Sequence, residues 1–392
     1  MTDVKVVIGA NFGDEGKGLM TDYFCHQATS KNKSCIVVMA NGGAQRGHTV
    51  TTLDGKHHVF NHFGSGSFVG ADTCCPHMFI VNPMQFFKEF KDLEQLNINP
   101  TVYVDARVRW TTPFDMIINQ IVESARGDKK HGSCGMGIWE TTVRYLAQPA
   151  SAGIFEFTQW CYSAKEEYLK NIRDNYMPQR LKDLGVADIP EEWRPIVYSP
   201  LLIYNFIKDV TFFCNHVKLL SKDTLKKYKT AVFENGQGLL LDQNNTFYGD
   251  NTTPSNTGVR NSLDLLNMYF DKAKVELCYV TRTYMTRHGV GRFETECNKS
   301  SLNSTMFDET NLTNPFQDHL RYGELIVDNL VKRVNNDAVN MNKCKFDFKT
   351  SIAVTHTNEY QFDYSRLRED LVTGVYTSDS KFRESVKQFK EF

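Results

Sequence analysis

Six short apolar runs, each closed by a polar or glycine-rich turn, recur along the 392-residue chain. They cover residues 4–9, 35–43, 101–107, 230–238, 275–284 and 351–358. Runs that are apolar on both faces, with helical patterns between them, predict buried parallel strands of a doubly wound sheet. We therefore predict an α/β fold with a mostly parallel central sheet flanked by helices. Ligands of such sheets bind beyond the carboxyl ends of the strands, where the unusual polar clusters of this chain also fall.

Residues 155–225 have a helical character that the rest of the chain lacks. Ser163 and Glu166 have the spacing of a capping box, which predicts the start of a helix. Ser199 before Pro200 predicts an N-cap followed by a proline in the first helical turn. We interpret 155–225 as a helical insertion or lobe within a single large domain, 1–392, rather than as an independent domain.

Composition excludes some classes of partner. Charged residues make up 23% of the chain and the formal net charge is −1, so no polybasic surface predicts nucleic-acid binding. No apolar run is long enough to span a membrane, and the first residues do not resemble a signal peptide. The ten cysteines contain no CxxC pair, which favours reduced thiols over a disulfide framework or a zinc site. We expect a cytoplasmic protein that binds neither nucleic acid nor a membrane.

The first turn, GDEGKG (13–18), resembles a phosphate-binding loop but contains two carboxylates. It is not the standard motif, because Asn11 and Gly18 stand where that motif has glycine and Ser or Thr. Free backbone N–H groups, a lysine and a helix N-terminus still form a phosphate cradle. Asp14 or Glu15 could then bind Mg²⁺ or act as a base beside the transferred phosphoryl group. The alternative is a glycine turn in which acidic residues cap a helix.

Two further clusters follow predicted strands. NGGAQRGHTV (41–50) contains His48, which could donate a proton or a hydrogen bond to charge that develops on oxygen. ENGQG (234–238) contains Gln237, whose amide could bind a purine edge or polarise a carbonyl. Taken singly, each cluster is also compatible with an ordinary structural loop.

The order of the motifs is more specific than any one of them. Together they resemble the adenylosuccinate synthetase family over most of the chain. The matching segments are GDEGKG (13–18), GGAQRGHT (42–49), GSCGMGI (132–138), ENGQGLLLD (234–242), SNT (255–257) and YMTRHGVGRFETE (284–296). This resemblance implies the P-loop-type nucleotide fold of that family and a homodimer. It also implies transfer of a γ-phosphoryl group to the 6-oxygen of a purine monophosphate, which the amine of L-aspartate then displaces.

The resemblance also implies roles for individual residues. Asp14 looks like the base that removes the N1 proton, His48 like the acid partner at the 6-oxygen, and Gln237 like a helper at the oxyanion. Mg²⁺ would be bound by Asp14 and by the carbonyl of Gly47. For Glu15, helix capping is the preferred interpretation. The residues expected to bind the nucleoside triphosphate are Gly13, Glu15, Gly16, Lys17, Gly18, Thr355, His356 and Asn358. Those expected to bind the acceptor and aspartate are Asn41, Gln45, Arg46, Ser133, Cys134, Thr253, Thr313, Gln317 and Arg321.

The loop AVTHTNEY departs from the family pattern T-K-x-D, in which the aspartate binds guanine. His356 and Asn358 stand at the lysine and aspartate positions. An asparagine has one acceptor and one donor group, which suits adenine better than guanine. We therefore expect ATP, or dATP, rather than GTP as the phosphoryl donor.

The acceptor loops also depart from the family. Gln45 and Arg46 replace asparagine and alanine, and Cys134 replaces a phosphate-contacting threonine, which leaves Ser133 as the hydroxyl there. The chain resembles a phage and archaeal-related branch of the family in its HGSCG turn, its loss of the guanine-binding aspartate and its replaced aspartate-binding segment. The phage members of this branch are 2-aminoadenylosuccinate synthetases that use dGMP and ATP. On this branch we expect dGMP as the acceptor, in the host cytoplasm if a phage encodes the chain. Asp14 favours the opposite assignment, because phage members typically have serine or glycine at that position. IMP therefore remains an alternative acceptor.

The arginine-rich segment that binds aspartate in the family is absent. TNPFQDHLRYG (313–323) takes its place, with Arg321 as the obvious carboxylate partner and Thr313 and Gln317 as further hydrogen-bonding groups. We expect this polar segment to form a lid over L-aspartate.

Two alternatives stay open. One is an ordinary adenylosuccinate synthetase that uses IMP, L-aspartate and GTP. The other is a regulatory nucleotide-binding protein without ligase activity. The latter is disfavoured because binding alone requires no acid–base pair such as Asp14 and His48.

Overall fold

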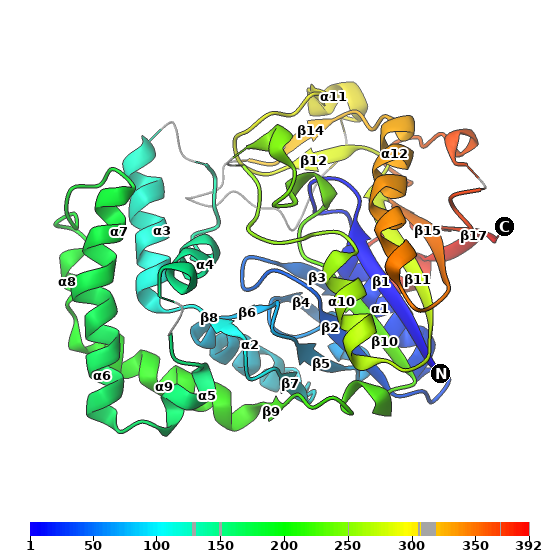
Figure 1. Ribbon diagram of the computed structural model, residues 1–392. Helices are drawn as coiled ribbons and strands as arrows, with labels where there is room; N and C mark the ends of the chain where they lie inside the picture. The colour runs from blue at the N-terminus through cyan, green and yellow to red at the C-terminus, as the bar shows by residue number, and fades with distance from the viewer. Residues whose placement is uncertain are drawn as a thin grey trace.

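A ten-stranded sheet forms the centre of the molecule (Figure 1), in the order β17-β16-β15-β11-β1-β10-β2-β5-β7-β9. The computed structural model describes residues 1–127, 131–148, 151–249, 251–304, 306, 319–368 and 370–391. Neighbouring strands are parallel throughout, except that β17 is antiparallel to β16. The strands are β1 (Thr2–Gly9), β2 (Cys35–Met39), β5 (Asp72–Cys75), β7 (Val102–Val104), β9 (Lys218–Leu219), β10 (Thr230–Glu234), β11 (Ala273–Arg282), β15 (Phe348–Thr355), β16 (Gly374–Thr377) and β17 (Lys387–Glu391). The predicted α/β class with a mostly parallel sheet is confirmed.

All six apolar runs form strands of this sheet, which are β1, β2, β7, β10, β11 and β15. The prediction missed β5, whose sequence DTCC contains Cys74 and Cys75, both buried. It also missed β9, β16 and β17, which lie at the two edges of the sheet. These strands are short or carry polar residues, so they lack the apolar run by which a buried strand can be recognised.

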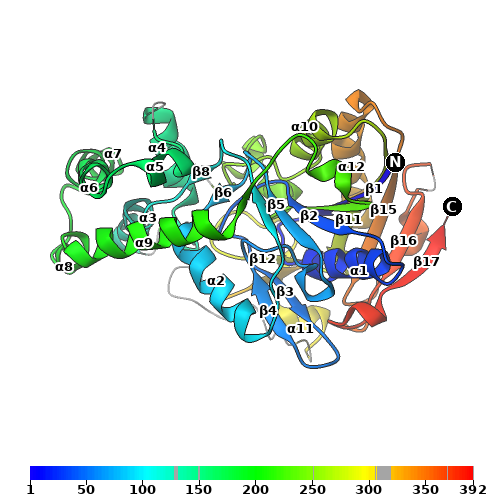
Figure 2. The same cartoon turned by 90° about the horizontal axis from the view of Figure 1, so that it is seen from below.

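Helices cover both faces of the sheet (Figure 2). Alternate side chains of β1 point to opposite faces, so Val7 joins one buried cluster while Val6 and Ile8 join the other. The first cluster includes residues of α1 and α2, and the second includes residues of α10 and α12. These helices are α1 (Lys17–Thr29), α2 (Pro83–Gln95), α10 (Arg260–Tyr269) and α12 (Val327–Ala338). The sheet is therefore buried on both sides, as its apolar strands require.

A group of helices stands at one side of the sheet, on the left of Figure 1. These are α3 (Pro113–Arg126), α4 (Ile138–Ala147), α5 (Ile154–Gln159), α6 (Tyr162–Asn171), α7 (Met177–Asp183), α8 (Arg194–Val197) and α9 (Pro200–His216). The helices between 154 and 216 fall within the predicted helical segment, and α7 packs against α3. That this segment is an insertion within one domain stays a prediction.

The predicted helix starts are correct only in part. Helix α6 begins at Tyr162 with Cys161 as its N-cap and no side-chain cap bond, so the Ser163–Glu166 capping box is wrong. Ser199 does precede α9 with Pro200 in the first turn, but its hydroxyl makes no cap bond. Within the described residues, no helix is long and apolar enough to cross a membrane.

Smaller elements surround the carboxyl edge of the sheet. They are the hairpin β3 (His48–Thr51) and β4 (His57–Phe60), the pair β6 (Ile80–Val81) and β8 (Arg109–Trp110), the three strands β12 (Met285–Arg287), β13 (Glu296–Cys297) and β14 (Arg321–Gly323), and helix α11 (Lys299–Leu302). The loops after β1, β10 and β2 meet at this edge because these strands are neighbours in the sheet. They carry Asp14, Gln237 and His48, respectively.

Candidate active site

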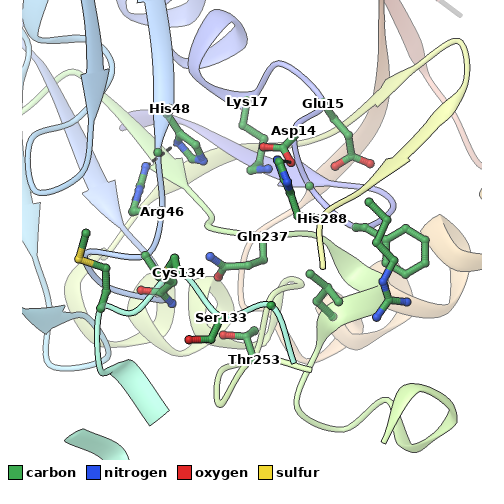
Figure 3. A pocket seen from close by; sticks show the side chains of 18 of the residues that line it. Asp14, Glu15, Lys17, Arg46, His48, Ser133, Cys134, Gln237, Thr253 and His288 are labelled. Atoms are coloured by element: carbon green, nitrogen blue, oxygen red, sulfur yellow. Dashed lines mark hydrogen bonds and ion pairs between the residues drawn. The ribbon is translucent and has the colours of Figure 1, made fainter. Parts of the chain in front are cut away.

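A cavity of about 950 Å³ lies among the loops at the carboxyl ends of the sheet's parallel strands. In Figure 3, Asp14, Lys17 and His288 lie together on one side, Ser133 and Thr253 on another, and Gln237 between them. Most of the predicted site residues line this one cavity, and their individual roles stay predictions. They are Gly13, Asp14, Glu15, Gly16, Lys17, Gly18, Gln45, Arg46, Gly47, His48, Ser133, Cys134, Gln237, Thr253, Thr355, His356 and Asn358.

Four predicted residues are not placed in the lining. Asn41 is fully buried, and its amide bonds to both polar backbone atoms of Gly236, at 2.7 and 3.2 Å. It therefore joins the loop after β2 to the loop after β10 rather than facing the cavity. Arg321 lies on β14, outside the lining. Thr313 and Gln317 lie outside the described residues, as does most of the predicted lid.

The backbone of Asp14 has a left-handed conformation, with φ of 56°. Such a conformation is uncommon for a residue other than glycine and persists where surrounding contacts fix it. One such contact is a hydrogen bond from Nε of Arg282 to the carbonyl oxygen of Asp14, at 2.5 Å. The carboxylate of Asp14 is 31% exposed, and its Oδ2 lies 3.4 Å from Nε2 of His288. It is thus oriented into the cavity and open to a ligand.

Glu15 is buried and turns back into the fold. Its Oε1 accepts the N–H of Asn11 at 2.6 Å. The N-cap of α1 is Gly16, without a side-chain cap bond, so the expected role of Glu15 as a helix cap is wrong. Burial raises the pKa of Glu15 to about 8, against the opposite influence of Lys17. Burial likewise lowers the pKa of Lys17, which Glu15 and Asp14 partly restore. An acidic and a basic side chain are therefore buried together in the 13–18 loop, and burial disfavours the charged form of each.

His48 is held by a buried carboxylate at the end of β10. Its Nδ1 lies 2.7 Å from Oε1 of Glu234, and Oε2 of Glu234 lies 2.7 Å from Nη2 of Arg46. The same Nδ1 lies 2.7 Å from Nη2 of Arg46, so it faces both an acceptor and a donor, and Nε2 is the nitrogen left for other partners. Ser65 also donates its hydroxyl and its N–H to the same carboxylate.

Charges in this network oppose one another. Burial and the charge of Arg46 lower the pKa of His48 to about 4, although Glu234 acts to raise it. Burial acts to raise the pKa of Glu234, but Arg46 and His48 outweigh it and lower that pKa to about 2. The ligand-free site therefore contains an ionised Glu234 and a neutral His48 at pH 7. Arg46 lines the cavity, but its guanidinium is bound within this network, since its Nη1 also donates to the carbonyl of Glu234 at 3.2 Å.

Two glutamine amides form the centre of the cavity. Gln237 has a left-handed backbone with φ of 55°, and its Oε1 is buried without a hydrogen-bond partner. Neither amide atom of Gln45 has a partner, and both are buried. A Cβ added to Gly42 would lie 3.3 Å from Nε2 of Gln45 and 3.5 Å from Oε1 of Gln237, so the two amides lie close together. Buried polar atoms left unpaired in a cavity are suited to bind a polar ligand.

The loop after α3 lines the opposite wall. The hydroxyl of Ser133 donates to Asn119 at 2.9 Å. The N–H groups of Gly132 and Ser133 donate to one carboxylate oxygen of Glu123, at 2.9 and 3.3 Å. Glu123 also pairs with Arg126, at 2.6 Å. Sequence reasoning missed Glu123 and Asn119, because they stand on a helix one or more turns before the recognised motif.

The environment of Arg321 differs from the prediction. Its guanidinium forms a bidentate pair with Glu296 and donates to the carbonyl oxygens of Gly289 and Gly291, at 3.0 and 2.8 Å. It therefore fixes the 289–291 turn, and its N–H groups are already bound and not available to a substrate carboxylate. Arg287, on the preceding strand β12, does line the cavity, and its Nε is buried without a partner. The segment YMTRHGVGRFETE (284–296) contains this arginine, but its spacing gave no reason to prefer Arg287 over Arg321.

The other end of the cavity is lined by Thr355, at the end of β15, and by His356 and Asn358, which follow this strand. His356 has a left-handed backbone with φ of 59°, and its carbonyl oxygen accepts the hydroxyl of Thr283 at 3.1 Å. Glu359 also lines the cavity here, and Tyr284 donates to its Oε2. Sequence reasoning missed Glu359, which follows the expected base-reading position directly.

Comparison with known proteins agrees with the arrangement of motifs. The family model described as adenylosuccinate synthetase matches residues 6–317. The adenylosuccinate synthetase of Chlorobium chlorochromatii is 29% identical over 307 residues, covering 74% of this chain and 64% of that protein. The adenylosuccinate synthetase of Lactobacillus acidophilus is 29% identical over 311 residues, covering 76% of this chain and 65% of that protein. The chain thus spans somewhat less than two thirds of the length of these relatives.

Two solved structures have a similar fold. The fully ligated adenylosuccinate synthetase of Plasmodium falciparum superposes with a TM-score of 0.68 at 14% identity, covering 99% of this chain and 100% of that one. The succinoaminodeoxyadenylate synthetase of cyanophage S-2L, bound to dGMP and to dATP as an energy donor, gives a TM-score of 0.61 at 14% identity, covering 99% and 95%. At this level of identity, the likeness establishes the shared fold alone.

A substitution at Gly238 tests the close packing of the loops that carry Asp14 and Gln237. A Cβ at this position would lie 2.3 Å from the carbonyl oxygen of Asn11, which is backbone and cannot swing away. We expect Gly238→Ala to separate the loops that carry Gln237 and Asp14 and to lower kcat by roughly a hundredfold, the scale of a displacement of about 1 Å. The matched control is Gly153→Ala, because its Cβ would meet nothing closer than 3.6 Å and lies outside the cavity. Turnover of Gly238→Ala close to that of the control would contradict this packing role.

The network around His48 predicts a pH dependence. In the ligand-free protein, an NMR titration should show His48 gaining its proton only near the pKa of about 4. Arg46→Met should raise this pKa towards the ordinary value of about 6.5, because it removes a buried positive charge. The exposed Lys56→Met serves as the control and should leave it unchanged. Since the folded pKa lies below the unfolded one, the unfolded chain binds the proton more readily, and the contribution of His48 to the unfolding free energy falls between about pH 6.5 and pH 4. An unshifted His48 in Arg46→Met would contradict the network.

Proposed function

Because the chain belongs to the adenylosuccinate synthetase family, we propose that it is a carbon–nitrogen ligase. It uses a nucleoside triphosphate to join the amine of L-aspartate to C6 of a purine monophosphate through a 6-phosphoryl intermediate. The observation that supports this most directly is the meeting of Asp14, His48 and Gln237 in one cavity, from the loops after three adjacent strands. A nucleotide-binding regulator needs a phosphate cradle but not this set of acid, base and amide groups, so the ligase is favoured over it.

The residues support a division of the first step. The carboxylate of Asp14, open to the cavity, takes the N1 proton of the purine, and the 6-oxygen attacks the γ-phosphorus as the bond to the β,γ-bridging oxygen breaks. Nε2 of His48 faces the purine 6-oxygen, on which negative charge develops. The negative charge of a bound triphosphate raises the pKa of His48 from its low ligand-free value, so that it can donate there. The amide of Gln237 donates to the same oxygen.

The second step forms the carbon–nitrogen bond. The aspartate amine attacks C6, the C6–oxygen bond breaks, and inorganic phosphate leaves. Loss of one proton from the new nitrogen then gives the N6-succinyl purine monophosphate. Of the cavity cations, Arg287 is the one proposed to bind an aspartate carboxylate, because the guanidinium of Arg321 is already bound to Glu296 and to backbone carbonyl oxygens.

Mg²⁺ fits the donor set of this site. No group of three or more His, Cys, Asp or Glu side chains that could hold a metal occurs among the described residues. Mg²⁺ needs no such group, since it is commonly bound by one or two carboxylates together with phosphate oxygens and water. Asp14, with its carboxylate 31% exposed in the cavity, and the carbonyl of Gly47 would hold it. When bound, the ion supplies positive charge to the triphosphate oxygens.

For the donor we propose ATP or dATP. Asn358 stands on the cavity and offers both a donor and an acceptor group to a purine edge. The neighbouring carboxylate of Glu359 could accept from guanine, but it already accepts from Tyr284. The cyanophage relative was solved with dATP as its energy donor, which is consistent with this choice.

For the acceptor we propose dGMP, with IMP as the alternative. The structure of Gln45 supports an altered acceptor pocket, because its unpaired amide lies beside Gln237. Arg46 does not add to this argument, since it is bound to Glu234 and His48. Asp14 favours IMP by its similarity to the ordinary family pattern, yet a carboxylate that accepts N1–H can also accept the neighbouring amino group of guanine. The product from dGMP would be a 2-amino-2′-deoxy-N6-succinyl-adenylate.

The proposal is tested by incubating the protein with Mg²⁺ and L-aspartate, with either ATP or GTP, and with dGMP, GMP and IMP in competition. We expect a succinylated product, phosphate and ADP, with dGMP consumed first, identified by mass. Product mainly from IMP would remove the dGMP assignment but keep the ligase. No succinylated product from any combination, with nucleotide binding intact, would support the regulatory alternative.

The donor preference has its own test. Asn358→Asp should shift the ratio of kcat/KM for GTP over ATP by about 1–3 kcal/mol, or roughly five- to 150-fold, the scale of one base-edge contact. Asn340→Asp, which makes the same change on an exposed helix end outside the cavity, is the matched control. If the unmodified protein already prefers GTP, the assignment of Asn358 to the donor base is wrong.

A further inference from the structure

The segment Arg282–Tyr284 lies between the two ends of the nucleotide site. Arg282 is the last residue of β11, whose neighbours in the sheet are β1 and β15. The loop after β1 carries Asp14, and the loop after β15 carries His356, Asn358 and Glu359. The side chains of this segment are buried, with 2–4% of each exposed.

On one side, the segment holds the loop of Asp14. Nε of Arg282 donates to the carbonyl oxygen of Asp14 at 2.5 Å. Because the left-handed backbone of Asp14 is strained, contacts to its own peptide groups decide whether that conformation is kept. The direction of the Asp14 carboxylate therefore depends in part on Arg282.

On the other side, the segment holds the loop of the donor base. The hydroxyl of Thr283 donates to the carbonyl oxygen of His356, which also has a left-handed backbone. The hydroxyl of Tyr284 donates to Oε2 of Glu359, and it accepts from Nη1 of Arg282 at 3.0 Å. Arginine can only donate and the hydroxyl has one proton, so the chain runs in a single direction from Arg282 through Tyr284 to Glu359. Its ends carry opposite charges, which strengthens each bond.

We propose that Arg282 and Tyr284 are positioning residues that couple a purine in the donor pocket to the placement of Asp14. This rests on the proposed function for its kinetic consequence. A purine bound by the 356–359 loop fixes Glu359, Glu359 fixes the hydroxyl of Tyr284, and Tyr284 fixes the guanidinium that holds the Asp14 carbonyl. The binding energy of the donor purine is thereby used to orient the Asp14 carboxylate, although the purine lies away from the phosphates.

The kinetic test is Tyr284→Phe, which removes the hydroxyl and preserves the ring. We expect kcat to fall by about tenfold to a hundredfold, as for a slightly misplaced catalytic group, with the KM for ATP changed less than about twofold. Arg282→Lys should lower kcat similarly, because a lysine cannot bond to both Asp14 and Tyr284 in the same way. If the three groups act as one chain, the double variant should be no slower than the slower single variant.

The matched control is Tyr228→Phe. Tyr228 is also a buried tyrosine that donates to a carboxylate, that of Asp72, but it lies outside the cavity. It should keep the kcat of the unmodified protein. A fall in kcat for Tyr284→Phe that is matched by the control, or that is fully additive with Arg282→Lys, would overturn the coupling.

A second measurement does not depend on turnover. Adenosine carries no phosphate, so it acts on the phosphate loop through base contacts alone, and any slowing caused by adenosine in the acceptor pocket would not require Tyr284. Saturating adenosine should slow amide hydrogen exchange at residues 11–16 in the unmodified protein and in Tyr228→Phe, but not in Tyr284→Phe. Equal slowing in all three, or none in the unmodified protein, would overturn the proposal. A protein without ligase turnover that shows the expected exchange pattern would contradict the proposed function while keeping the coupling.

Discussion

The buried carboxylate of Glu234 is the interaction on which the arrangement of the site depends. It stands at the end of β10, is fully buried, and accepts hydrogen bonds or ion pairs from Arg46, His48 and Ser65. These partners come from segments more than 160 residues away in sequence. A buried carboxylate is costly unless it is paired and hydrogen-bonded, so all three partners are held in place by the same requirement. The imidazole of His48 is thereby fixed at the cavity, with its protonation set by the balance between Arg46 and Glu234.

Strained backbone conformations are a second, independent feature of the same site. Among the residues that the structure describes, five other than glycine have a positive φ, and three of them, Asp14, Gln237 and His356, line the cavity. Each follows the carboxyl end of a strand of the parallel sheet and is held by contacts from a neighbouring loop. Strain of this kind commonly occurs at binding and catalytic sites, where surrounding structure keeps a side chain in a direction that a relaxed loop would not give. The loops are thus organised before any ligand binds.

The parts of the fold that could be predicted are those with a local signal. β1, β2, β10, β11 and β15 are apolar on both faces, so each is recognisable from its own residues. The edge strand β17 and its neighbour β16 are not, because pairing with a neighbour, rather than an apolar run, makes them strands. The loops of Asp14, His48 and Gln237 could be found because glycine spacing and motif order are properties of the sequence alone.

The sequence does not show which partners several charged side chains bind. The sequence suggests that Glu15 caps a helix, but its carboxyl group accepts the N–H of Asn11. It also suggests that Arg321 is available to a substrate carboxylate, but Arg321 is bound to Glu296. Arg46 reads as an acceptor-binding residue but pairs with Glu234, 188 residues away. A charged side chain on a loop has several possible partners, and the sequence does not show which of them burial will bring within hydrogen-bonding distance.

The central claim is that the cavity transfers a γ-phosphoryl group reversibly to the 6-oxygen of a purine monophosphate before aspartate reacts. Positional isotope exchange tests it most directly, using ATP with a heavy-oxygen label in the β,γ-bridge, Mg²⁺ and the acceptor, without aspartate. The account predicts that the label moves to the non-bridging β-oxygens in the presence of the acceptor only, and that Asp14→Asn abolishes this movement. Full ligase turnover with aspartate but no movement of the label in its absence, or equal movement in Asp14→Asn, would contradict it.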